Sequence, residues 1–374
     1  MIVWVIAGLL GMATGLRLGW ALVNQQSVVS GAMIVALGNL AVLAALNWPP
    51  LTLLVDTALG WPNIAVALSQ VALVMSAAGS CVMITSVAAR ASRRLAVIQY
   101  GFAAVIAVAT LVLFLNDGRE AEMAPKAYLA RNVGLPGEVF DWLVPMLYVL
   151  LTLSVVAWVG IRLSSASRRG RALLLFTAGM ALIVGASAYF VTRAVGRSQL
   201  VGVGTALTLL LCAMAIVAAG ALLPTCEDWI GARRELRLIE PLRAEMERRH
   251  PDIGIGVRPR GPLVFRVAER LSLLSDALYL EGSLAQQVGG AGGDCPEVAA
   301  DNDAAEQARA VAAWIRAGRD EVGTAFPGRS WLRQPAECPD RDWILEIARQ
   351  YRELTNGPSH VRDGAGLPAG PESG

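Results

Sequence analysis

The sequence predicts an all-α protein: a polytopic membrane bundle of seven transmembrane helices (residues 1–226) followed by a small helical cytoplasmic domain (227–355). The first observation is the position of the acidic residues, because six of the 30 Asp and Glu precede Cys226 and the other 24 follow it. The second is a series of long apolar stretches between these few acids, as expected where a charge is costly at the bilayer centre. The third is a hydrophobic content of 55%, against roughly 45–50% in soluble domains.

Each predicted span has about the 20 mostly apolar residues that are needed to cross the hydrocarbon. We do not expect the first to be a cleavable signal peptide, because its apolar run is too long and a second span follows almost at once. The seven segments lie at about 2–23, 28–47, 62–88, 95–115, 140–161, 172–192 and 199–223.

Basic residues beside the spans predict the orientation, because cytoplasmic loops carry an excess of Lys and Arg. We therefore expect a multi-pass plasma-membrane protein with its N-terminus outside and its C-terminus in the cytoplasm. Eleven Arg share the expected cytoplasmic side: Arg90, Arg93, Arg94, Arg162, Arg168, Arg169, Arg171, Arg233, Arg234, Arg237 and Arg243. The loops on the other side hold five basic residues: Arg119, Lys126, Arg131, Arg193 and Arg197.

Two loops on the expected outer side are predicted to be structured. Residues 47–61 (NWPPLTLLVDTALGW) are apolar, flanked by Trp and broken by two prolines. This is typical of an interfacial segment or of one that re-enters the bilayer, and the sequence leaves both open. Pro62 is expected to begin the third span at its first helical position. The loop at 117–138 is expected to form a short surface helix near 121–132.

Three polar residues inside the spans are candidate cavity-lining residues: Arg17, Asn39 and Gln70. Arg17 lies near the cytoplasmic end of span 1, where its side chain either snorkels to the surface or contacts a ligand or lipid phosphate. Asn39 and Gln70 lie in spans 2 and 3, and amides in such positions either bond to a neighbouring helix or line a cavity. No internal repeat of the kind found in many secondary transporters is recognisable.

The cytoplasmic domain begins with a membrane-proximal amphipathic segment from about residue 227. Pro241 is expected to interrupt this segment and to open a short helix that ends before Pro251. His250, one of only two histidines, is expected to act as a cation at the C-terminus of that helix. A basic cluster that we expect against anionic lipid headgroups consists of Arg233, Arg234 and Arg237.

Further helices are predicted at 263–287, 304–317 and 340–354. In the first of them, apolar residues spaced three and four apart form a seam of only two heptads. This seam fits either packing inside a small bundle or a coiled coil between two copies, so a homo-oligomer stays open. Residues 356–374 are rich in Pro, Gly and Ser and are expected to be disordered. The candidate partner-binding residues are Glu269, Arg270, Asp276, Trp343 and Tyr351.

Composition and motifs argue against several classes of function. A net charge of +2 gives no sign of a nucleic-acid-binding surface. Five scattered Cys and two His provide no zinc-binding spacing, and there is no phosphate loop, HExxH or GxSxG pattern. We therefore expect no enzyme activity, no cofactor, no metal and no nucleic-acid partner, and we expect the lipid bilayer to be the main partner.

Two stretches carry a resemblance to a known family. One is Asp56 followed by TALGWPNIAVAL, and the other is RLIEPLRAEMERRHPDIGI leading into VFRVAERLSLLSDALYL. They resemble a family of actinobacterial seven-span membrane proteins that are catalogued as transporters and end in a cytoplasmic domain of unknown function. With the topology, the resemblance covers nearly the whole chain, and it implies a membrane bundle but no substrate.

Two hypotheses follow. In the first, the chain is a membrane sensor or scaffold that acts through a cytoplasmic protein partner bound by residues 227–355. In the second, the spans enclose a pathway for a small solute, as the family's label implies. The lack of carboxylates inside the spans favours the first, because coupled carriers usually need them.

Overall fold

The computed structural model describes residues 2–23, 27–89, 93–116, 121–133, 139–196, 203–253, 263–288, 303–317, 332, 334–335 and 338–356. Within these ranges all regular structure is helical, so the predicted all-α fold class is confirmed. The chain divides into two compact units, Met1–Thr225 and Cys226–Gly374, and each is described by itself. The disordered end predicted at 356–374 lies outside the described residues except for Asn356.

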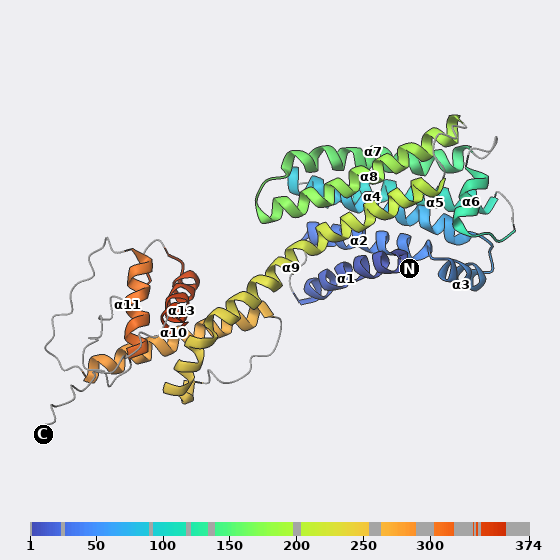
Figure 1. Cartoon of the computed structure of the whole chain (residues 1–374). Helices are drawn as coiled ribbons and strands as arrows, with labels where there is room; N and C mark the ends of the chain where they lie inside the picture. Colours follow the sequence, from blue (N-terminus) through green and yellow to red (C-terminus); the bar gives the residue numbers. More distant parts are fainter. Residues whose placement is uncertain are drawn as a thin grey trace, which may run out of the picture. The chain divides into compact units, whose positions relative to one another are not determined.

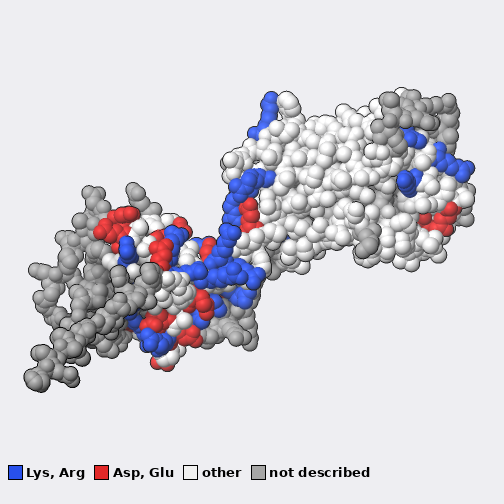
Figure 2. All heavy atoms as spheres, in the orientation of Figure 1, with Lys and Arg blue, Asp and Glu red and all other residues white. Residues whose placement is uncertain are grey.

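Seven helices of the described chain are long and apolar enough to cross a membrane, as the sequence predicts (Figure 1). The surface of the first unit that faces the viewer in Figure 2 is almost free of charge except near its two ends. These helices are α1 (Ile2–Val23), α2 (Val28–Leu46), α4 (Ile64–Ala89), α5 (Arg93–Asn116), α7 (Val139–Leu163), α8 (Arg168–Gly196) and α9 (Val203–Arg249).

The helix α4 lies at the centre of the first unit, where it packs against α2, α5 and α7. Its small residues allow close approach, as is usual between membrane helices. Ser76 donates a hydrogen bond to the carbonyl oxygen of Ala36 at 3.0 Å. Gly79 lies so close to the α2 backbone that an added Cβ would be 2.8 Å from the amide nitrogen of Ala36.

The third span begins at Ile64, so the expected start at Pro62 is wrong. The chain turns first, because Gly60 and Asn63 have φ angles of +66° and +61°. The side chain of Asn63 holds the next loop: it donates to the carbonyl oxygen of Ala121 at 3.0 Å and accepts from the backbone N–H of Met123 at 2.9 Å.

Asp56 explains why α4 begins where it does. Its carboxylate is buried, and one oxygen accepts a hydrogen bond from the backbone N–H of Ala65 at 2.8 Å. This bond satisfies one of the free N–H groups in the first turn of α4.

We expect Asp56→Ala to destabilise the first unit by about 0.5–2 kcal/mol, the usual cost of removing a helix cap. The measurement is hydrogen exchange of the first turn of α4, together with the thermal unfolding of the full chain in detergent. Thr57→Val is the matched control, because the Thr57 hydroxyl is exposed and, within the described part of the chain, bonds to Leu53 of its own helix. Equal protection in wild type and Asp56→Ala would contradict the capping role.

Two short helices lie at the same end of the first unit. The apolar segment 47–61 contains α3 (Pro49–Leu59), a helix of 11 residues, which is too short to cross the hydrocarbon. The helix α6 (Pro125–Asn132) buries Tyr128 and Asn132. It is therefore more than the surface helix expected there, because its aromatic side chain packs against α7, with the Tyr128 and Trp142 rings 6.3 Å apart.

The second unit forms a small helical bundle around one apolar core. The helix α9 passes through Pro241 without a break, so the expected interruption there is wrong. Ile239 and Leu242 on either side of the proline are fully buried, and we attribute the continuity to this packing. The remaining elements are η1 (Pro251–Ile253), α10 (Leu263–Val288), α11 (Ala304–Ala317) and α13 (Asp340–Asn356).

The apolar seam of α10 faces this core. Four of its five residues, Val267, Leu271, Leu274 and Leu278, are buried within the unit, whereas the first, Val264, is exposed. The seam is therefore occupied inside one chain, and the coiled-coil alternative for it is not supported.

A buried ion cluster joins three helices of the second unit. The Glu281 carboxylate on α10 has a side-chain exposure of 1% and lies 2.9 Å from Arg249 Nη1 and 2.6 Å from His250 Nε2. Arg249 also lies 2.6 Å from Glu245 and donates to the carbonyl oxygen of Ile315 on α11. His250 is thus tied to a specific carboxylate, which the sequence prediction of a helix-terminal cation did not include.

Candidate functional site

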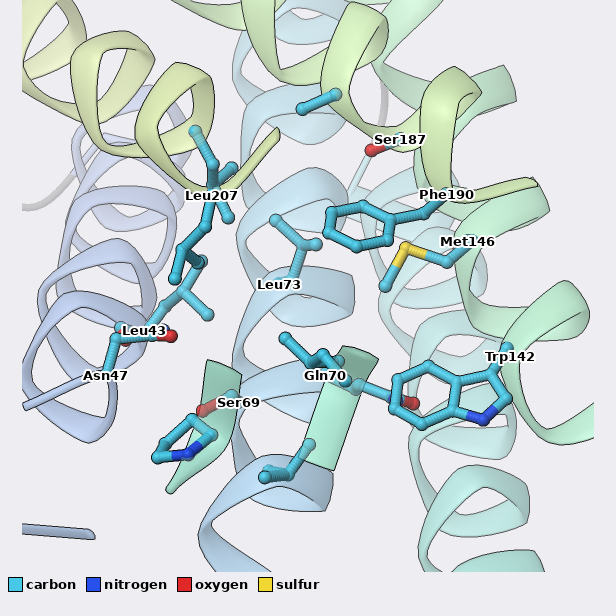
Figure 3. A pocket seen from close by; sticks show the side chains of 15 residues that line it. Leu43, Asn47, Ser69, Gln70, Leu73, Trp142, Met146, Ser187, Phe190 and Leu207 are labelled. Atoms are coloured by element: carbon cyan, nitrogen blue, oxygen red, sulfur yellow. The ribbon is translucent and has the colours of Figure 1, made fainter. Parts of the chain in front are cut away.

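A pocket in the first unit is enclosed by six helices. Four of them contribute one end each: the C-terminal end of α2, the N-terminal end of α4, and the first turns of α7 and α9. The last turns of α8 and the short helix α6 complete the lining. Most of its lining is apolar, as Figure 3 shows. The lining residues are Leu43, Asn47, Val66, Ser69, Gln70, Leu73, Pro125, Leu129, Trp142, Met146, Ala186, Ser187, Phe190, Leu207 and Leu210.

The pocket is small and closed at its deep end. About 60 Å³ is open to the centres of water-sized molecules, which is room for a few waters. One turn further along α4, α7, α8 and α9, the interior is filled by side chains that are at most 1% exposed: Ala77, Val149, Ile183 and Met214. The next layer is also packed, with the Ser80 hydroxyl 4.0 Å from the Met180 sulfur. The pocket therefore does not continue through the bundle.

Gln70 is the polar group with the most unused hydrogen-bonding capacity in this pocket. Its side chain reaches toward the Trp142 ring (Figure 3), and no described residue bonds to its amide. Two neighbouring polar groups are engaged: Ser69 donates to the Ala65 carbonyl oxygen, and the Asn47 amide nitrogen donates to the Leu43 carbonyl oxygen, each at 2.8 Å. Gln70 thus offers two donors and an acceptor to a ligand.

The helix α6 covers one side of the pocket and is held in place by α8. Arg193 of α8 donates to the carbonyl oxygen of Ala130 at 3.2 Å, and Leu129 and Pro125 face the pocket from α6. This hydrogen bond joins α6 to the last turns of α8.

The three candidate cavity residues have different environments. Gln70 lines the pocket, whereas Asn39 donates to the Val35 carbonyl oxygen of its own helix at 2.8 Å and does not line it. Arg17 donates to the Ala221 carbonyl oxygen of α9 at 3.2 Å. Only Gln70 of the three is therefore placed to meet a ligand in this pocket.

The candidate partner-binding residues separate into two groups. Trp343 and Tyr351 are 2% and 8% exposed and belong to the core of the second unit, so they do not form an accessible surface there. Glu269 and Asp276 are exposed on α10. Arg270 is partly buried and lies 3.5 Å from Glu240 on α9.

Sequence reasoning missed most of the pocket lining. Trp142, Met146 and Phe190 look like ordinary core residues in a span, and periodicity does not tell a residue that faces a cavity from one that faces a packed helix. The usable signal was a lone amide in an apolar span, and it identified Gln70. Nothing in the sequence indicated that α6 would cover the pocket.

The fold defines a multi-pass helical membrane protein with a second, separate helical unit, and the site defines a small apolar pocket with one free amide. No protein-family model, curated protein or solved structure matches the chain. Within the described residues there is no group of three or more His, Cys, Asp or Glu that could hold a metal.

Proposed function

We propose that the chain is a membrane sensor or scaffold. Its seven-helix unit binds a small, uncharged, mostly apolar molecule through Gln70, and its second unit binds a protein partner. The observation that carries the proposal is a pocket with a free amide and a closed deep end, which fits a binding site better than a pathway. We also propose a plasma-membrane location with the N-terminus outside, on the strength of the eleven Arg beside spans 3, 5 and 7.

The ligand class follows from the lining. Fifteen residues line the pocket, and none of them carries a charge, so an ionic ligand would lose its hydration without compensation. An apolar molecule with one hydroxyl or amide group would fill the space and bond to Gln70. A ligand that lacks such a group would leave the amide unpaired, which costs affinity.

The alternative function is transport of the same solute. The pocket favours this alternative because a carrier also needs a binding site for its solute. A carrier would have to open the packed layer at Ala77 and Met214 to release the solute on the other side. The resemblance to the actinobacterial seven-span family points the same way by its label alone. Flux of short-chain alcohols across vesicles that contain the full chain, lost in Gln70→Leu, would establish transport and count against the sensor proposal.

We expect Gln70→Leu to remove the preference for a hydroxylated ligand over its alkane. In the full chain, ethanol should raise the unfolding temperature more than ethane does, because a ligand of this size fits the space, and Gln70→Leu should reduce that difference to nearly zero. The loss of one neutral hydrogen bond corresponds to about 0.5–1.5 kcal/mol of binding free energy. Gln99→Leu is the matched control, because Gln99 lies in a different groove beside Cys81. An unchanged preference in Gln70→Leu would refute the assignment of the pocket.

The partner proposal depends on the exposed acidic face of α10. Glu269 and Asp276 are seven residues apart, which places them on one side of the helix. A pull-down from native membranes that compares the full chain with Glu269→Ala/Asp276→Ala tests this face, and a chain truncated after Ala232 tests the whole unit. A near-stoichiometric partner lost in both variants would support the scaffold role, and no partner at all would count against it.

A further inference from the structure

A basic groove lies on the surface of the second unit, separate from the pocket of the first. Three helices line it, and about 730 Å³ is open to water-sized molecules. The α9 residues of the groove recur at intervals of three or four, which is one face of a helix. The lining residues are Arg233, Leu236, Arg237, Glu240, Pro241, Ala244, Arg270, Arg352 and Asn356.

The charge of this groove is strongly positive. Four of its lining residues are Arg and one is acidic, Glu240. Hydrogen bonds from Arg243, at 2.7 and 3.1 Å, already engage Glu240 and hold its pKa below its usual range. Arg270 also lies 3.5 Å from it. The one carboxylate in the groove is thus committed to Arg243 and Arg270.

The remaining cations keep free donors. Among the described residues, Arg237 and Arg352 have no acidic partner. Arg270 lines the groove from α10. Asn356 adds an amide to the same groove. Figure 2 shows Arg side chains gathered along the part of α9 that belongs to this unit. Guanidinium groups that line one groove suit a phosphate, because each can bond to two of its oxygens.

Residues that precede the groove on α9 indicate where the phosphate comes from. Trp229 and Ile230, one turn before Arg233, are 49% and 43% exposed. The guanidinium of Arg233 lies 5.2 Å from the centre of the Trp229 ring. A Trp beside Arg at the end of an apolar span is typical of the lipid–water interface. A lipid that contacts Trp229 with its acyl part would bring its headgroup to the Arg side chains.

We propose that this groove is a binding site for the phosphate of an acidic phospholipid headgroup, contacted by Arg233 and Arg237 of α9, Arg270 of α10 and Arg352 of α13. The site goes beyond the predicted contact of the α9 basic cluster with a membrane surface. It includes residues of three helices, so it forms only when the second unit is folded. It does not depend on the ligand proposed for the pocket.

The test measures binding of short-chain phosphatidylglycerol to the full chain in a neutral detergent, with phosphatidylcholine of the same chain length as the comparison lipid. We expect Arg237→Gln/Arg352→Gln to weaken phosphatidylglycerol binding by roughly thirtyfold. The matched control is Arg248→Gln/Arg349→Gln. It makes the same change in net charge, and both of its Arg residues lie outside the groove and pair with Glu245 and Glu346.

Three further results decide the proposal. Arg237→Lys/Arg352→Lys should bind more tightly than the Gln variant and less tightly than the wild type, because the charges remain but the two-oxygen contacts are lost, and this variant guards against a folding defect in the Gln variant. Equal losses in the Gln variant and its matched control would overturn the site in favour of diffuse charge. Displacement of phosphatidylglycerol by equal concentrations of glycerol phosphate or inorganic phosphate would overturn the lipid source and indicate a soluble phosphate ligand.

Discussion

Replacement of Glu281 by glutamine is expected to destabilise the second unit by about 3–5 kcal/mol, the usual cost of removing one partner from a buried ion pair. The carboxylate is 1% exposed and binds Arg249 and His250. Without it, Arg249 keeps Glu245 and the Ile315 carbonyl oxygen, but a cation is left in the interior with one carboxylate fewer. The helices α9, α10 and α11 meet at this cluster, so its loss should loosen all three.

Hydrogen exchange measured on the full chain by mass spectrometry provides the test. We expect peptides from α10 and α11 to exchange faster in Glu281→Gln, while peptides from α4 and α8 of the first unit keep their protection. Glu346→Gln is the control, because its pair with Arg349 is largely at the surface and such pairs contribute less than about 1 kcal/mol. Unchanged protection of α10 in Glu281→Gln would show that the cluster does not hold the unit together.

The second large effect is expected at the contact between α2 and α4. A Cβ at Gly79 would lie 2.8 Å from the Ala36 nitrogen and 2.9 Å from the Ala32 oxygen. Both are backbone atoms, so the helices themselves must separate to admit a side chain. We expect Gly79→Leu to cost about 3 kcal/mol or more, at the upper end of what overpacking costs in a core.

The same substitution at Gly185 is the control, because nothing lies within 4 Å of a Cβ there and the residue is exposed on α8. The measurement is the unfolding temperature and the folded fraction of each variant in detergent. Gly185→Leu should behave like the wild type, whereas Gly79→Leu should unfold earlier or fail to accumulate. Similar unfolding temperatures for the two variants would mean that α2 and α4 can separate without a loss of stability.

The spans could be predicted from the sequence because a membrane imposes one dominant rule. Each crossing helix must be apolar for about 20 residues, and this requirement does not depend on its neighbours. The residues at which the helices begin and end were harder to predict, because they depend on contacts with neighbouring segments. The start of α4 at Ile64 is set by Asp56 from the preceding helix, and the length of α9 by the packing that surrounds Pro241.

The pocket could be predicted only at Gln70, since a free amide is unusual in an apolar helix whereas Trp142 or Phe190 is not. Whether Asn39 lines a cavity or bonds within its own helix is a matter of side-chain rotation, which the spacing of residues does not determine. In the second unit, Trp343 and Tyr351 were predicted to bind a partner because they share the apolar face of the last helix. Residues on such a face also pack in hydrophobic cores, and in this protein both belong to the core of the second unit.

The hydrogen bond between Arg17 and the Ala221 carbonyl oxygen has a consequence for how the protein is made. It joins the first span to the seventh, and 204 positions separate the two residues in the chain. A ribosome that has delivered only α1 leaves that guanidinium without its acceptor until α9 has also been inserted. Until then the Arg17 charge must be solvated by lipid headgroups or water while five further membrane helices are inserted. The contact between α1 and α9 is therefore formed late in biosynthesis. Nascent chains that end before α9 lack the acceptor for Arg17, and this unpaired arginine would mark them for the quality control of membrane proteins.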